Sequence, residues 1–146
     1  MRAAAADDGL VDAWQEALAA EHAAVYAYGV VAGRLDRDTP PQVRATASYR
    51  AHLERRDVVA ARIAAADAVP VQAEPAYELP GRITDAASAR PVAQQVEDRC
   101  AVVHAAVVAA AEDDRRTEAL GWLTDCATRL LAWGGSASAL PGYERP

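Results

Sequence analysis

Residues 10–35, with the sequence LVDAWQEALAAEHAAVYAYGVVAGRL, decide the fold. Residues suited to a buried face recur in this stretch at alternating steps of three and four, which is the spacing of the inward face of a bundle helix. The residues of this face are Val11, Trp14, Leu18, Glu21, Val25, Tyr28, Ala32 and Leu35. All of them are apolar or aromatic except the acidic Glu21. The stretch therefore predicts a long helix that carries a carboxylate on its buried side.

Three further stretches show the same helical spacing, and residues that break helices separate them. In the second stretch the expected inward face is Tyr49, Leu53, Arg56, Ala60 and Ile63. We therefore predict an all-α single domain of four helices with one long connection and a tail. The expected bounds are about 10–35, 41–67, 85–111 and 117–133 for the helices, 68–84 for the crossover and 134–146 for the tail.

The helix breakers differ in kind. Pro40 and Pro41 are expected to start the second helix, and the charged run 112–116 is expected to form a tight turn before the fourth. Thr84 is the predicted N-cap of the third helix, which Pro91 is expected to bend. Gly134-Gly135 is expected to end the fourth helix.

The connection at 68–84 decides how the helices are arranged. It contains three prolines and cannot continue a helix. An extended segment of this length can run along a helix of about 30 Å. Two short-looped hairpins joined by such a crossover are typical of ferritin-like bundles. The alternative is an up-down-up-down bundle with a loose middle loop, which is less common in a compact domain.

Composition excludes several classes of function. The net charge of −6 argues against a nucleic-acid binder, because phosphate contacts need a concentrated basic surface. Charged residues interrupt every long apolar run, so no membrane span is expected. The N-terminal stretch turns acidic at Asp7 and is a poor signal peptide. These features predict a cytoplasmic protein.

Four polar residues on the inner faces are predicted to pair. In each hairpin, residues equidistant from the turn lie at the same height, which matches Glu21 with Arg56 and Glu97 with Arg129. A buried carboxylate needs a partner, and a guanidinium group can pair with two carboxylates at once. We therefore expect Glu21, Arg56, Glu97 and Arg129 to form a neutral interior network. The alternative is that the arginines extend into solvent and the acids are only half-buried.

The same positions suggest how this bundle differs from metal-binding ones. Di-iron proteins of the ferritin class carry a Glu on two helices and Glu-x-x-His on the other two. Glu21 and Glu97 match the single acids, whereas Leu53-x-x-Arg56 and Cys126-x-x-Arg129 stand at the paired motifs. Because a guanidinium group cannot bind a metal ion, no metal and no cofactor are predicted.

Short motifs spread over residues 10–133 resemble a bacterial ferritin-like family known only as a domain of unknown function. They are Glu21-His22, Val25-Tyr26-x-Tyr28, His52-x-x-Arg55-Arg56-Asp57, Ala76-Tyr77-x-Leu79-Pro80, Thr84-Asp85-Ala86 and Trp122-Leu123-Thr124-Asp125. The resemblance implies a ferritin-like fold with no assigned activity.

His22, His52, Tyr26 and Asp57 are candidates for a second polar site, because imidazole binds metals and titrates near neutral pH. For His52 a hydrogen-bonded structural role is the favoured interpretation. His104 is level with Trp122, which favours packing. Tyrosines such as Tyr26 could also line a small pocket beneath the crossover, although such residues are more often part of a core.

The two cysteines, Cys100 and Cys126, fall at the same height in the second hairpin. In a reducing compartment they are expected to be small buried residues and not a disulfide or redox pair. The spacing alone leaves open whether their side chains touch.

These features predict a non-enzymatic, metal-free ferritin-like domain with no catalytic residue. It would act by protein association or by binding a small molecule, with an unidentified partner. Alanine-rich outer faces and an exposed region around Trp133 favour a homodimer. The alternative is a metal-binding oxidoreductase or storage protein with an unusual Glu/His site, and a third is a ligand pocket beneath the crossover near Tyr77.

Overall fold

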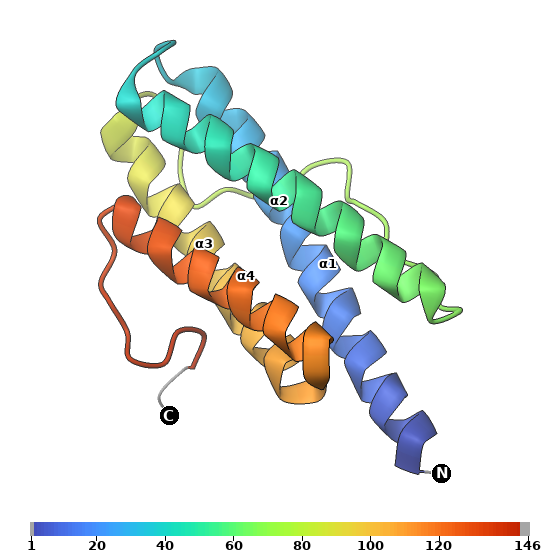
Figure 1. Ribbon diagram of the computed structural model, residues 1–146. Coiled ribbons are helices and arrows are strands. Elements are labelled where there is room, and N and C mark those ends of the chain that lie inside the picture. The colour runs from blue at the N-terminus through green and yellow to red at the C-terminus, as the bar shows by residue number, and fades with distance from the viewer. Residues whose placement is uncertain (1, 144–146) are drawn as a thin grey trace.

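The computed structural model describes residues 2–143, with side chains from residue 8 onward, and is built from α-helices (Figure 1). The prediction of an all-α four-helix bundle is confirmed. The helices are α1 (Arg2–Arg34), α2 (Pro40–Ala65), α3 (Ala86–Ala110) and α4 (Asp113–Ala132).

Three helix starts differ from the prediction. The helix α1 begins at Arg2 because the alanine-rich N-terminal stretch has high helix propensity. The helix α4 includes most of the charged run 112–116, since acidic residues are favourable in a first turn. Asp85, and not Thr84, caps α3: its carboxylate accepts from the Ser88 backbone N–H, which lowers the pKa of Asp85.

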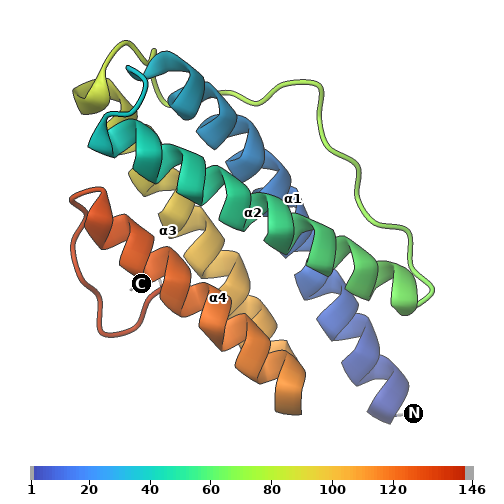
Figure 2. The same cartoon turned by 45° about the horizontal axis from the view of Figure 1, so that its top comes forward.

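The chain forms two antiparallel hairpins, α1 with α2 and α3 with α4, and α1 also packs against α3. Residues 66–85 run along the outside of the bundle, so that α2 and α3 begin at the same end of the molecule (Figure 2). The long crossover was expected. Because α3 runs in the same direction as α2, the alternative up-down-up-down arrangement is excluded.

The crossover is held against α1 by side chains. The Gln15 amide donates to the Val69 carbonyl at 2.7 Å and accepts from the Val71 N–H at 2.8 Å. His22 bonds the Val71 carbonyl at 3.0 Å. The rings of Tyr26 and Tyr77 lie 5.6 Å apart. The hydrogen bonds from Gln15 and His22 satisfy backbone N–H and C=O groups of this extended segment.

The core has apolar ends and a polar middle. At one end Leu10, Trp14, Leu18, Ile63 and Val107 pack together, and at the other Tyr28, Val31, Ala45, Val92 and Trp133 do so. Trp133 is buried beneath Arg44, so the prediction of an exposed Trp133 region is wrong. None of the described helices combines the length and apolar character needed to cross a membrane.

Candidate functional site

Glu21 lies at the centre of the polar layer and is fully buried. Its Oε2 is 2.7 Å from His52 Nδ1, and its Oε1 is 2.6 Å from His104 Nε2. Arg55 Nη1 lies 3.5 Å from the same Oε1. Burial by itself would raise the pKa of Glu21, but the hydrogen bonds from His104 and His52 outweigh it and lower the pKa to about 2. Glu21 is therefore an anion.

His52 bridges the two buried acids. Its Nδ1 faces Glu21, while its Nε2 lies 3.3 Å from Glu97 Oε1. Burial favours the neutral ring, but bonding to both carboxylates overrides burial and raises the pKa of His52 to about 10. At neutral pH the ring is an imidazolium that donates from both nitrogens. It also stacks on the Tyr28 ring, with centroids 5.4 Å apart.

Glu97 on α3 is fully buried and accepts a hydrogen bond from Tyr28 at 2.5 Å. Burial and the Glu97 charge raise the pKa of Tyr28 well above its usual range, so the phenol keeps its proton. The second carboxylate oxygen of Glu97, Oε2, has no hydrogen-bond partner among the described residues.

His104 is the neutral histidine of the layer. Burial lowers its pKa, and the bond to Glu21 compensates only in part. A neutral ring that donates from Nε2 leaves Nδ1 as an acceptor, and that atom has no partner within the described chain. The His104 ring also packs against Trp122, as the sequence predicted, with centroids 5.4 Å apart.

Arg55 connects the buried layer to the surface between α2 and α4. It is 4% exposed, and its Nη2 lies 2.6 Å from Asp125 Oδ2. Asp125 also pairs with Arg129 at 2.8 Å, and Arg129 donates to Ser48 at 3.1 Å. Burial alone would raise the pKa of Asp125, but its bonds to the two arginines lower it. Long polar side chains therefore bridge these two helices.

The charges in the layer balance. Glu21 and Glu97 face the His52 imidazolium and the Arg55 guanidinium, and Asp125 is matched by Arg129. A layer in which every buried charge meets its opposite avoids the large cost of an isolated buried ion.

Both cysteines are free, buried and adjacent. The contact with Cys126 and burial raise the pKa of the Cys100 thiol, which is therefore protonated at neutral pH. Arg55 Nη1 lies 3.2 Å from Cys126 Sγ. Cys126 thus contacts both the Cys100 thiol and the Arg55 guanidinium of the charged layer.

Residues 13–145 match a protein family described as a domain of unknown function, DUF4439. The chain belongs to this family. It is 31% identical to a conserved hypothetical protein, rv2844, from Mycobacterium tuberculosis, over 90% of this chain and 89% of that one, with a TM-score of 0.79. A bacterioferritin-related protein from Bacteroides fragilis, described as a dodecameric thioferritin, shares the fold at 19% identity and a TM-score of 0.74, over 88% and 83% of the two chains. A search of curated proteins gave no match.

The network of this DUF4439 domain differs from the one expected from sequence. Glu21 and Glu97 are buried as predicted, but Arg56 is 31% exposed and bonds Asp57. The buried face of α2 is Ser48, His52, Arg55, Val59 and Ile63, one residue away from the predicted face at most positions. Arg55 therefore takes the place assigned to Arg56.

The predicted contact between Glu97 and Arg129 is also absent from the ion pairs of the described residues. Arg129 is 22% exposed and reaches Asp125 and Ser48 instead. Tyr28 and His52 are the partners of Glu97, because they approach it from α1 and α2 while Arg129 lies towards the surface.

The four residues of the predicted second site do not come together. His22 bonds the crossover, Tyr26 packs on Tyr77, and Asp57 is exposed beside Arg56. Of the four, His52 belongs to the buried layer, in the hydrogen-bonded role that the sequence favoured for it. A small hollow does lie beneath the crossover, of about 190 Å³ and lined in part by Tyr77.

The ferritin-like fold raises the question of a metal ion in the polar layer. Glu21, His52 and Cys100 offer ligand atoms within 4.8 Å of one another, and such O, N and S donors suit zinc or iron. However, Glu21 is hydrogen-bonded at both oxygens and the His52 ring is protonated on both nitrogens. Arg55 adds a positive charge beside them. The donor types suit a metal ion, whereas the hydrogen bonds that occupy both oxygens of Glu21 and the adjacent Arg55 charge do not.

Proposed function

We propose that this protein is a metal-free, non-enzymatic ferritin-like domain that works by binding a small molecule or a protein partner. The observation that carries the proposal is the matching of Glu21 and Glu97 by His52 and Arg55. In a metal-binding bundle, the ion itself neutralises the buried acids. Here side chains of the domain supply that positive charge.

The proposed role of the network is to hold the helices in one arrangement. His52 links α2 to α1 and α3, and Arg55 links α2 to α4. Because each bond requires a specific geometry, the network favours one packing over others that an alanine-rich core would tolerate. A fixed bundle of this kind can present binding surfaces.

Elemental analysis of protein purified without chelator tests the proposal. We expect less than about 0.1 equivalent of iron, manganese or zinc per chain, which is the level of ordinary contamination. The thermal midpoint should be the same in EDTA and in added metal, because a ligand stabilises only a fold that binds it. A stoichiometric metal that disappears in both Glu21→Gln and Cys100→Ser, but remains in the exposed control Glu54→Gln, would overturn it.

A metal-binding oxidoreductase or storage protein is the second candidate. It is favoured by the Glu21, His52 and Cys100 cluster and by two buried atoms, Glu97 Oε2 and His104 Nδ1, that have no hydrogen-bond partner in the part of the chain that the structure describes. Binding would require His52 to lose a proton. Calorimetric titration with Zn²⁺ or Fe²⁺ at two pH values would then show proton release, whereas the metal-free proposal expects no saturable heat.

A homodimer and a cytoplasmic location extend the proposal. Exposed apolar side chains on α4, Leu120 and Leu131, support self-association. The two adjacent free thiols fit a reducing compartment. Light scattering after size exclusion should give twice the chain mass, and a monomer at all concentrations tested would rule out the dimer.

A further inference from the structure

The segment after α4 folds back across α3 and α4. Gly134 and Gly142, both with positive φ, lie near the two ends of this tail. A side chain on Gly142 would collide with the Ala101 carbonyl and the Ala105 side chain on α3. Glycine at 142 therefore lets the tail approach the α3 backbone closely, and the tail is held at both ends.

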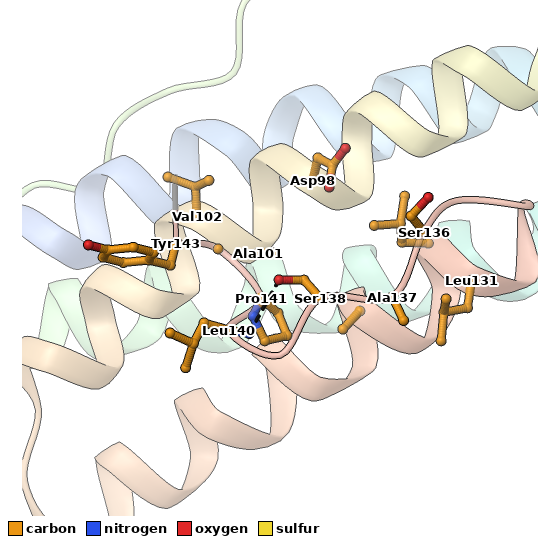
Figure 3. Close-up of a pocket in the computed structure, with 13 residues that line it drawn as sticks. Asp98, Ala101, Val102, Leu131, Ser136, Ala137, Ser138, Leu140, Pro141 and Tyr143 are labelled. Carbon is orange, nitrogen blue, oxygen red and sulfur yellow. Dashed lines mark hydrogen bonds between the residues drawn. The ribbon is translucent and has the colours of Figure 1, made fainter. Parts of the chain in front are cut away.

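Between these ends the tail arches over a cavity of about 380 Å³, which is within the usual range for small-molecule sites. Its walls are mainly aliphatic and come from both helices and the tail (Figure 3). They include Ala101, Val102, Ala127, Leu130, Leu131 and Leu140.

Asp98 is the only charged residue that lines this cavity among those described. Figure 3 shows it on α3, with the tail running along the other side of the cavity. No hydrogen bond or ion pair within the described residues contributes to the titration of its side chain. Asp98 is exposed at the edge of the cavity, and the limited burial of its carboxylate together with the neighbouring Glu97 raises its pKa.

We propose that this cavity binds a small molecule with an apolar body and one protonated amine, which pairs with Asp98. Aliphatic walls favour the apolar body, and a cation would supply the missing charge partner. The inference deepens the proposed binding function. The proposed site contains none of the buried acids and histidines. A failed ligand titration would therefore leave the metal-free proposal standing, and a bound interior metal would leave the ligand proposal standing.

Calorimetric titration with two probes of the same shape tests the site: 2-(1-naphthyl)ethylamine and its neutral analogue 2-(1-naphthyl)ethanol. We expect one molecule of amine per chain, bound about tenfold more tightly than the alcohol, as for one charge-assisted contact. Asp98→Asn should remove this tenfold preference and leave alcohol binding unchanged. The control Asp12→Asn, on an exposed face of α1, should bind as the unmodified protein does.

A second pair of variants tests the cavity itself. Ala127→Leu fills space under the tail and should weaken both probes by tenfold or more, whereas Ala61→Leu on the exposed face of α2 should not. The proposal is overturned if neither probe binds, if amine and alcohol bind equally, or if Ala127→Leu binds like its control. A stoichiometric interior metal would refute the proposed metal-free function without affecting these outcomes.

Discussion

The two ends of the bundle and its middle are stabilised in different ways. The ends are apolar: Leu18 and Ile63 at one, Val31 and Ala45 at the other, are fully buried among other apolar side chains. The middle buries Glu21, His52 and Glu97 just as completely. Apolar packing tolerates exchanges of similar volume, whereas a buried charge layer works only when every member is present. The middle should therefore be the more sensitive region.

Replacing one charge in the layer should have the largest effect. Glu21→Gln keeps the shape but leaves His52 and Arg55 short of a negative partner, so we expect about 4 kcal/mol lower unfolding free energy. Urea denaturation measures it. The exposed Glu54→Gln should change stability by less than about 0.5 kcal/mol. An equally small effect for Glu21→Gln would mean that the layer contributes no more than surface charges do.

A truncation at an apolar end should cost somewhat less. Leu18→Ala removes buried methyl groups and leaves a cavity, with an expected loss of about 3 kcal/mol. Leu18→Met, which nearly conserves volume, should cost less than about 1.5 kcal/mol. If the conservative change proved as damaging as the truncation, the ends would be as strictly specified as the middle.

Two adjacent arginines distinguish the buried layer from the surface. Arg55→Met should lower stability by about 2 to 3 kcal/mol, because Glu21 and Asp125 lose a shared partner. Arg56→Met should change it by less than about 0.5 kcal/mol, since the ion pair of Arg56 among the described residues is with the exposed Asp57. Chemical denaturation of both variants compares them directly. The reverse ranking would restore the arrangement expected from sequence.

The pH dependence should reflect the shifted groups of the buried layer, with His52 and Glu21 setting its two limbs. The pKa of His52 is raised from 6.5 to about 10, so its contribution is complete below pH 6.5 and is lost as pH rises towards 10. The pKa of Glu21 is lowered from 4.5 to about 2, so its contribution is present above pH 4.5 and is lost as pH falls towards 2.

The lowered pKa of the buried His104 adds a loss of stability as pH falls below 6.5, so stability should be greatest near about pH 6.5 and fall by about 2 kcal/mol from pH 7 to 9, at most 1.4 kcal/mol per pH unit. The charged or titratable groups facing His52 are Glu21, Glu97, Tyr28 and Arg55, and the latter two titrate above this range. Urea midpoints measured across pH test the decline. A flat profile in His52→Gln would show that the decline is due to His52. A flat profile in the unmodified protein would contradict the predicted decline.

Much of the fold could be predicted from sequence, because apolar spacing and proline position act locally. The stripe containing Leu18 and Tyr28 indicated α1, and three prolines indicated the crossover. The face of α2 could not be chosen in this way. Tyr49 and Leu53 are apolar and suggested one face, whereas Ser48, His52 and Arg55 form the face that is buried.

The sequence did contain a signal for the correct face. The positions 48, 52, 55, 59 and 63 also follow helical spacing, and the last two are Val59 and Ile63. That stripe was not predicted to be the buried face, because polar residues are expected at the surface. What outweighs this expectation is the presence of Glu21 and Glu97 on the facing helices, a long-range effect that the pattern of one helix does not contain.

The attachment of the crossover to α1 has a consequence for assembly. An extended connection between two hairpins is long enough to let one hairpin leave and dock on a second molecule, as happens in domain swapping. The Gln15 amide bonds both Val69 and Val71, and Tyr77 rests against Tyr26, so the connection is bound along its own first helix. Hairpin exchange would have to break these contacts. They therefore favour packing of the two hairpins within one chain over exchange between two chains.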